Sequence, residues 1–173
     1  MKLDNLKKEL GTSVVQRAQL ELGVTRKING KKVRRVASDK LRKSLTYIVN
    51  GRKINFVTGV PYGKFIHEGV NGTNQNWGSE YSFGSKQPPL DPIKRWMKQK
   101  GVRVRKKGGG FAKQTEANVN GLAYAISKGV KIKGIAPVPF YSLAISNIFQ
   151  TQSNLVDEAL RKDIELIIDL EWQ

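Results

Sequence analysis

The stretch that decides the fold is LTYIVNGRKINFVTG, residues 45–59. Two runs rich in β-branched and aromatic residues flank an Asn-Gly pair, which is the strongest short-range signal for a β-hairpin. Alternation in the second run puts Ile54, Phe56 and Thr58 on one face. We therefore expect an antiparallel hairpin over about residues 45–58.

The segment before this hairpin has the period of an amphipathic helix over residues 3–22. Its apolar stripe consists of Leu3, Leu6, Leu10, Val14, Ala18 and Leu22. Gly23 follows at the position of a C-terminal cap. Ser38 and Asp39 are suited to cap a second, short helix that ends at Ser44.

Helical spacing recurs after the hairpin. One segment begins near Asp91 and is stopped by Gly101. Two more cover 116–129 and 140–149, and a stretch with two prolines, GIAPVPF, separates them. The last runs over about residues 153–170. Its predicted apolar face consists of Val156, Ala159, Leu160, Ile164, Ile167 and Ile168.

Three further stretches predict long loops: 24–37 and 102–115 are basic, and 70–89 is rich in Gly, Asn, Ser and Gln. Within the first, Asn29-Gly30 could instead turn a short hairpin. We expect both basic stretches to be mobile in the isolated protein, since they have few apolar anchors. The predicted fold is α+β: one domain over 1–173, with a small antiparallel sheet packed with three to four helices.

The charge is large and unevenly distributed. The chain has 31 Lys/Arg and 14 Asp/Glu, a net charge of +17. Residues 1–113 hold 26 Lys/Arg and 7 Asp/Glu, a net charge of +19. Residues 114–173 hold 5 Lys/Arg and 7 Asp/Glu, a net charge of −2. This asymmetry predicts that one surface faces nucleic acid or an acidic protein. A basic surface kept only for solubility is the plainer alternative.

The candidate contact residues for such a partner lie in the two basic stretches. They are Lys27, Lys31, Lys32, Arg34, Arg35, Arg103, Arg105, Lys106 and Lys107. Binding of these residues to phosphates would be independent of base sequence and would weaken steeply with salt. Charge alone does not decide between DNA and an acidic protein.

The sequence offers little for catalysis. It has no cysteine and one histidine, His67, and its HEGVN context lacks the second histidine of a zinc-protease helix. It has no phosphate-binding GxxxxGK[ST] loop and no cluster of carboxylates suited to two metal ions. We expect no enzyme activity, no catalytic residue, no metal and no cofactor, with His67 a partly buried polar side chain. With no signal peptide and no long apolar run, we expect synthesis in the cytosol and no membrane segment.

Four segments, in order, resemble a known family: DKLRKSL (39–45), VPYGKFIHEGVNGT (60–73), PPLDPIKRWMKQKG (88–101) and LAYAISKGVKIKGIAPVPFYSLAI (122–145). Together they are similar to the small head–tail connector, neck or tail-completion proteins of tailed bacteriophages. The residues that carry the likeness include Tyr62, Phe65, Glu68, Gly69, Trp96, Pro139 and Phe140.

This resemblance implies a structural subunit of the virion. The expected assembly is a closed homo-oligomeric ring, six- or twelve-fold, that joins a portal or adaptor to the tail. Such a ring uses a heterologous interface that closes by rotation. The basic loops would line the DNA channel or grip acidic faces of neighbouring rings. A basic protein that binds nucleic acid without sequence preference is the alternative function.

Overall fold

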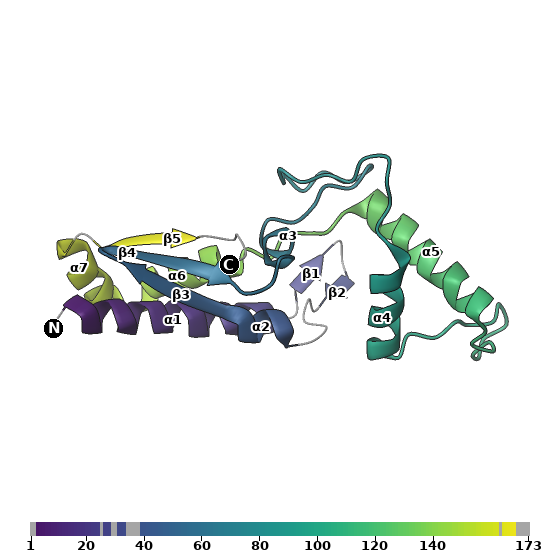
Figure 1. The fold of residues 1–173 in the computed structure, drawn as a ribbon, viewed down its shortest axis with the longest axis horizontal. Coiled ribbons are helices and arrows are strands. Elements are labelled where there is room, and N and C mark those ends of the chain that lie inside the picture. The colour runs from purple at the N-terminus through teal and green to yellow at the C-terminus, as the bar shows by residue number, and fades with distance from the viewer. Residues whose placement is uncertain (1–2, 25, 29–30, 34–38, 163, 169–173) are drawn as a thin grey trace. The chain divides into compact units, whose positions relative to one another are not determined.

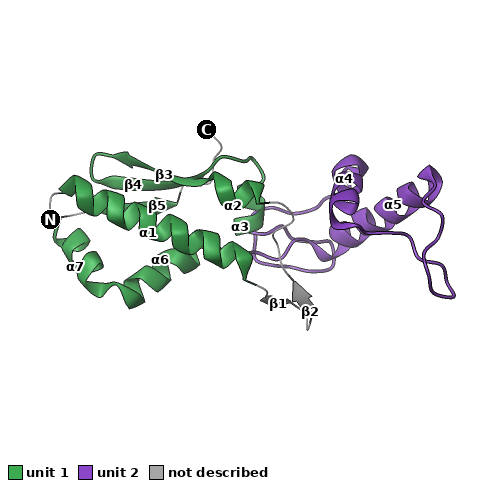
Figure 2. Ribbon diagram, turned by 90° about the horizontal axis from the view of Figure 1, so that it is seen from below, with its two compact units in different colours: residues 1–68, 138–173 green, residues 69–137 purple. Residues whose placement is uncertain are grey.

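The computed structural model describes residues 3–24, 26–28, 31–33, 39–162 and 164–168 (Figure 1). The fold is α+β, as predicted. The predicted single domain of 1–173 contains two compact units, which Figure 2 colours separately. Unit 1 consists of residues 1–68 and 138–173, and unit 2 of residues 69–137. Unit 2 is therefore one continuous stretch of chain, inserted between the two segments that make up unit 1.

The predicted hairpin is confirmed. Strand β3 (Leu45–Asn50) pairs with β4 (Lys53–Thr58) in antiparallel fashion. The turn residues are Gly51 and Arg52, one position later than the Asn-Gly pair suggested. Gly51 has a φ of +60°, as the first central residue of the tight turns that suit hairpins requires.

The predicted inner face of β4 is also confirmed, since Ile54, Phe56 and Thr58 are at most 1% exposed. Val57, on the opposite face, is buried as well. β4 is the central strand of a three-stranded sheet with the order β3-β4-β5.

The third strand corrects the C-terminal helix predicted over about 153–170. Helix α7 ends earlier (Ser153–Arg161), and β5 (Glu165–Ile168) pairs with β4 in parallel, which makes the sheet mixed. Three alternating residues turn inward to the core: Ile164, Leu166 and Ile168. In this segment the two-residue alternation of a strand therefore prevails over the spacing of a helix. Leu160, predicted on the apolar helix face, is 58% exposed.

In unit 1, helix α1 (Leu3–Gly23) packs against β3, β4 and α6 (Phe140–Thr151). Its predicted stripe is confirmed, with five members at most 1% exposed: Leu6, Leu10, Val14, Ala18 and Leu22. Lys7 is also buried, and its ammonium donates to the Gly51 carbonyl at 3.0 Å and pairs with Asp4. The turn of the hairpin is thus fastened to α1.

Two short helices complete unit 1: α2 (Lys40–Ser44) and α3 (Gly63–His67). The predicted helix ending at Ser44 is confirmed. Asp39 occupies its N-cap position but makes no side-chain capping hydrogen bond. Ser38, the other expected cap, lies outside the described residues.

Unit 2 consists of α4 (Leu90–Lys100), α5 (Glu116–Lys133) and long connections. Gly101 ends α4, as predicted, and it has the left-handed conformation. Helix α5 begins where the sequence indicated and extends to Lys133, beyond the expected end at 129. The buried side chains in this unit are few: Val70, Met97, Ala123, Ser127 and Ala136.

The remaining pair of strands, β1 (Arg26–Ile28) and β2 (Lys31–Val33), forms an antiparallel ribbon of its own. Of the two alternatives for residues 24–37, hairpin or irregular loop, the structure contains the hairpin. No further strand pairs with this ribbon in the part of the chain that the structure describes.

Candidate interface for nucleic acid or an acidic partner

The excess charge belongs to two regions. Unit 2 holds 13 Lys/Arg and 3 Asp/Glu, a net charge of +10. The stretch 24–37 adds six Lys/Arg and no acid. The rest of unit 1 is almost neutral, with 12 basic and 11 acidic residues. A partner attracted by charge would therefore meet unit 2 or the β1–β2 stretch.

In unit 2, residues 102–114 fold back on themselves and form what we call the basic loop. The amide of Ala112 donates to the Val104 carbonyl at 2.9 Å, and the amide of Lys106 donates to Gly110 at 3.1 Å. The turn uses two left-handed residues, Gly109 (φ +89°) and Gly110 (φ +70°). The run of three glycines thus permits a reversal that side chains would disfavour.

The side chain of Gln114 closes the base of this loop. Its Oε1 accepts from the amide of Val104 at 3.2 Å, and its Nε2 donates to the Ala112 carbonyl at 2.6 Å. Thr115 then caps α5 by accepting from the amide of Asn118. The basic loop is therefore held at both ends by hydrogen bonds.

The loop gathers two predicted contact residues around one aromatic ring. The guanidinium of Arg103 lies 4.6 Å, and that of Arg105 5.6 Å, from the centroid of Phe111. Positions 103 and 105 share a side of the extended chain, and Arg105 bridges to Phe111 across the turn. Phe111 is 51% exposed. Cation–π contact orients the guanidinium groups while leaving them open to a partner.

Lys106 and Lys107 lie at the exposed turn of the same loop, so the structure brings four of the predicted residues together. The sequence did not identify the role of Phe111. The sequence does show one aromatic residue, Phe111, directly after the three glycines that follow the arginines, and this spacing could have indicated the contact. The predicted mobility of residues 102–115 stays a prediction.

The other predicted contact residues belong to the β1–β2 stretch. Lys27 lies on β1 and faces Lys32 on β2, while Lys31 begins β2. Arg34 and Arg35 lie outside the described residues. The structure therefore joins Lys27, Lys31 and Lys32 in one ribbon.

The residues of the 60–73 segment shape the point where the chain enters unit 2. Tyr62 occupies the N-cap position of α3, is 41% exposed, and has a pKa raised by burial. The Lys64 ammonium lies 5.5 Å from the ring of Phe65. Glu68 caps the other end of α3 through its backbone amide, which donates to the Lys64 carbonyl.

Gly69 has a φ of +78°, and a Cβ there would lie 2.6 Å from the carbonyl oxygen of Ile135. The next residue, Val70, exchanges both backbone hydrogen bonds with Ile135 at 2.8 Å. A glycine is required because two backbone segments of unit 2 approach each other closely here.

Phe140, which follows Pro139 at the start of α6, is fully buried. The ring of His67 meets it edge-on with centroids 4.8 Å apart. His67 Nε2 lies 3.3 Å from Ser142 Oγ, and its buried Nδ1 has no hydrogen-bond partner among the described residues. Burial lowers the pKa of His67 to about 4. His67, expected to be partly buried, is a fully packed core side chain, and it is neutral above this pKa.

Neighbouring Tyr141 was not identified from the sequence. Its hydroxyl lies 2.7 Å from the Val57 carbonyl and 3.1 Å from that of Thr46, and burial raises its pKa. It thereby links α6 to both strands of the hairpin. Trp96, by contrast, is 39% exposed on α4.

The long loop of 70–89 is organised by Asn71. Its Nδ2 donates to the Ser79 carbonyl at 2.6 Å, and its Oδ1 accepts from the amides of Trp77 and Ser79. Trp77 in turn donates from its indole nitrogen to the Lys133 carbonyl at 2.8 Å. The loop is therefore fastened to the C-terminal end of α5.

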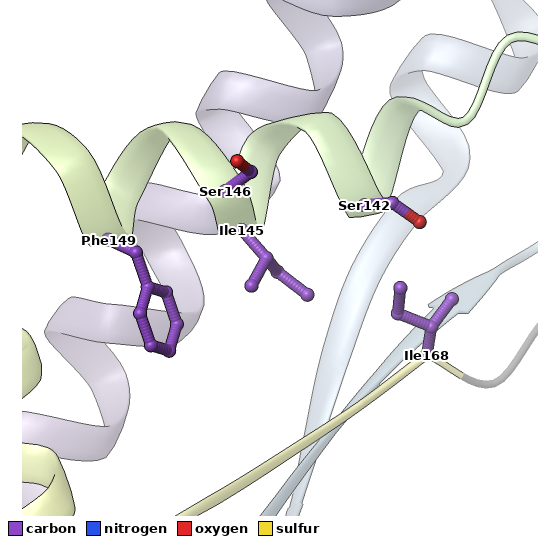
Figure 3. Close-up of a pocket in the computed structure, with 5 residues that line it drawn as sticks. All are labelled: Ser142, Ile145, Ser146, Phe149 and Ile168. Carbon is purple, nitrogen blue, oxygen red and sulfur yellow. The ribbon is translucent and has the colours of Figure 1, made fainter.

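A shallow apolar groove runs between α6 and β5 in unit 1. It is lined by Ser142, Ile145, Ser146, Phe149 and Ile168. Figure 3 shows Ile145 and Phe149 pointing from α6 toward β5, with Ile168 pointing back toward α6. The lining carries no titratable group, so the groove suits an apolar surface better than a reactive substrate.

In the described residues, no three His, Cys, Asp or Glu side chains come together in a way that could hold a metal ion. No described helix is both long enough and apolar enough to cross a membrane. No protein-family model, curated protein or solved structure matches this chain.

Proposed function

We propose that this chain is a structural, non-enzymatic subunit of a ring in the neck or tail of a tailed-phage virion. The ring would join a portal or adaptor to the tail and would be a closed homo-oligomer. Its basic loop would hold an acidic face of a neighbouring ring or line the channel through which DNA passes. The ordered series of four segments that resembles this family is the starting point of the proposal.

The observation that carries the proposal is the difference in packing and charge between the two units. Outside the stretch 24–37, unit 1 supplies a packed, nearly neutral body, and unit 2 carries a net charge of +10 with Arg103 and Arg105 arranged around Phe111. A ring subunit needs a rigid body to dock and a separate surface to meet the next layer. The basic loop supports such a surface, because its backbone is fixed at the base by Gln114.

Non-specific binding of nucleic acid is the second candidate, and the same loop favours it. Exposed Phe111 could stack on a base while the two guanidinium groups contact phosphates, a combination typical of single-strand binding. The affinity would fall with salt, with a slope of about −0.9 per neutralised phosphate on logarithmic axes for duplex DNA.

The test uses two triple variants with the same change in net charge. In the first, Arg103, Arg105 and Lys106 are replaced by Gln. In the second, Gln replaces three exposed lysines of unit 1: Lys8, Lys40 and Lys43. Each is introduced into phage, and the attachment of tails to filled heads is scored by electron microscopy. We expect only the loop variant to block attachment.

Deletion of residues 103–113 is the stricter form of the test. We expect the shortened chain to keep its circular dichroism spectrum, because the loop contributes no buried apolar residue, and to leave heads without tails. Normal particles from this deletion would remove the loop from the proposed mechanism. If particles are normal but the purified loop variant loses DNA binding, the second candidate takes precedence.

A further inference from the structure

The sheet of unit 1 has two open edges. β4 is its central strand, with β3 on one side and β5 on the other (Figure 1). In the described part of the chain, no strand pairs with the outer side of either edge strand. Natural sheets commonly protect such edges with charged side chains, prolines or bulges, because an unprotected edge pairs with other chains.

The edge formed by β3 lacks this protection. Its sequence, LTYIVN, contains no charged residue and no proline, and its six residues pair with β4 in an unbroken register. Ile48 and Val49 are 38% and 39% exposed. On β5, the one charged residue is Glu165, which pairs with Lys53 of the same chain at 3.2 Å. Both edges therefore retain the properties of strands that accept a further strand.

On β3, alternate residues direct their backbone groups away from β4. Ser44, directly before the strand, accepts from the amide of Gly59, directly after β4, at 3.1 Å. The even-numbered residues of β3 continue this contact with β4. The amides and carbonyls of Tyr47 and Val49 therefore point to the open side.

The same alternation holds on β5. The amide of Glu165 donates to the carbonyl of Arg52 at 3.0 Å, so the backbone groups of Glu165 face β4. Those of Leu166 and Ile168 therefore point to the open side. Each edge thus presents two residues whose backbone donors and acceptors face outward.

The two edges match when β3 of one copy lies antiparallel to β5 of another. One register brings the outward backbone groups together, and it pairs apolar or aromatic side chains with apolar ones and polar side chains with polar ones. Its four pairs are Val49 with Leu166, Tyr47 with Ile168, Ile48 with Ile167, and Asn50 with Glu165. A slip of two residues would oppose Ile48 to Glu165 or Asn50 to Ile167, so this register is favoured.

The groove beside β5 also suits this neighbour. Ile145 and Phe149 of α6 line it together with Ile168 (Figure 3). A strand added at the usual spacing of about 4.8 Å would cover the groove. Val49 on that strand shares a face with its fully buried partner Ile54, so its side chain would point toward the groove. Phe149, 46% exposed in the single chain, would gain cover.

We propose that β3 of one copy adds in antiparallel direction to the open edge of β5 in a neighbouring copy, so that the sheets of successive copies become one continuous sheet. Within a chain β3 and β5 already run in opposite directions, so copies rotated about an axis along the strands meet in this way. The two edges are different surfaces of the same chain. The contact is therefore heterologous and can close into a ring. The choice of a second copy as the partner rests on the proposed ring.

Engineered disulfides test this pairing directly, because the chain has no cysteine of its own. An Ile48→Cys chain is mixed with an Ile167→Cys chain under mild oxidation, and linked dimers are measured on non-reducing gels. In the proposed register these positions form a non-hydrogen-bonded pair with Cα atoms about 4.5 Å apart, which a disulfide can bridge. The matched control is Ile48→Cys with Glu165→Cys, a diagonal pair on the same face about 7–8 Å apart. We expect several-fold more linked dimer with Ile167→Cys.

A chain that contains both Ile48→Cys and Ile167→Cys gives a second measurement. Within one chain, β4 separates the two positions by two strand spacings, about 10 Å, so the bond cannot close inside the chain. We expect a ladder of linked copies that ends at one closed species. A ladder without a closed species would mean open chains of copies and would overturn the ring geometry of this contact.

A backbone variant tests the β3 edge without disulfide geometry. Val49→Pro removes an amide that points outward and leaves the hydrogen bonds to β4 in place. Val49→Thr is the matched control, because it keeps this amide and a β-branched side chain. We expect sedimentation to show monomers for Val49→Pro and unchanged assembly for Val49→Thr, with both folded by circular dichroism. Val49→Lys, which places a charge at the edge, replaces the proline variant if the latter unfolds.

Equal yields from Ile167→Cys and Glu165→Cys would overturn the inference, as would linkage mainly between two Ile48→Cys chains. Sedimentation of the untreated protein separates this result from the proposed function. A ring that forms without the bond between positions 48 and 167 removes this interface and keeps the ring. Monomers without the bond remove the interface and leave the virion role to the tail-attachment test. The bond together with normal tail attachment by the basic-loop variant would keep the interface and remove the proposed role of the loop.

Discussion

In unit 1, the sheet and the helices α1, α2, α6 and α7 enclose an apolar cluster in which Phe56, Phe140 and Tyr141 are fully buried. Unit 2 buries few side chains in its described residues, the largest of them Met97. Hydrogen bonds hold it instead: those of Asn71 lie within the 70–89 loop, and that of Trp77 joins the loop to α5. Apolar burial therefore holds unit 1 together, whereas directional polar contacts hold the strongly basic unit 2.

The two tryptophans of unit 2, Trp77 and Trp96, allow the units to be followed separately. The third, Trp172, belongs to the sequence of unit 1. In a Trp172→Phe background, tryptophan fluorescence reports on unit 2, and circular dichroism reports on both units. The following variants use this background.

The largest expected effect is in unit 1. Phe140→Ala removes a fully buried ring and should lower the free energy of unfolding by about 3–5 kcal/mol, measured by urea denaturation with circular dichroism. The control is Phe149→Ala, 46% exposed on the same helix, with an expected loss under about 1 kcal/mol. Similar losses from both would mean that the cluster does not dominate the stability of unit 1.

Acid should weaken unit 1 selectively. His67 has a pKa of about 4 in the folded state, below its ordinary value of 6.5, because burial disfavours the charged form. The unfolded chain therefore binds a proton that the folded chain excludes, and stability falls as the pH falls from 6.5 toward 4. The total loss is at most about 3 kcal/mol.

Urea titrations at several pH values measure this slope. His67→Gln should remove most of it, since no titrating group then remains at that site. The fluorescence transition of unit 2, which contains no histidine, serves as the internal control. An unchanged slope in His67→Gln would assign the acid sensitivity to carboxylates instead.

In unit 2, Asn71→Ala removes the bonds to Ser79 and Trp77. We expect the free energy of unfolding, measured by fluorescence, to fall by about 2 kcal/mol. The reason is that the Ser79 carbonyl and the Trp77 amide, both partly buried, lose their hydrogen-bond partner. Asn76→Ala is the matched control, since this exposed side chain accepts only from the Gly78 amide among the bonds described. If Asn76→Ala costs as much as Asn71→Ala, the loop is not organised by Asn71.

The smallest effect on stability is expected in the basic loop. Gln114→Ala should change the free energy of unfolding by less than about 1 kcal/mol, because the side chain is exposed. It should still speed trypsin cleavage after Arg103, Arg105 and Lys106, measured by mass spectrometry. We also expect cleavage of 24–37 and 102–115 in the free protein and protection of both in virions. Equal resistance in the free protein would contradict the predicted mobility.

The elements that could be predicted from the sequence are those specified by local pattern. The stripe of α1 and the hairpin at 45–58 each follow from a single period within one segment. The last segment was ambiguous, because apolar residues at 164, 167 and 168 fit a helix and those at 164, 166 and 168 fit a strand. Pairing with β4, which lies about 110 residues earlier, decided between the two.

The candidate site was predicted as a set of charges but not as a geometry. Lys106 and Lys107 were found by composition alone, whereas the stacking of Arg103 and Arg105 on Phe111 depends on a turn through Gly109 and Gly110. Asn71 was missed for a related reason. Bonds from a side chain to distant backbone groups leave no periodic trace in a sequence.

The join between the units has a consequence for engineering and for evolutionary change. In unit 1, the amide of Val138 donates to the Ile66 carbonyl at 2.8 Å, so the chain returns close to where it left. In unit 2, Val70 and Ile135 pair in the same way at its two ends. Residues 69–137 thus form a cassette with adjacent ends, which a tight turn could replace at little loop-closure cost. The body of the protein and its charged surface can therefore be exchanged, shortened or diversified independently of each other.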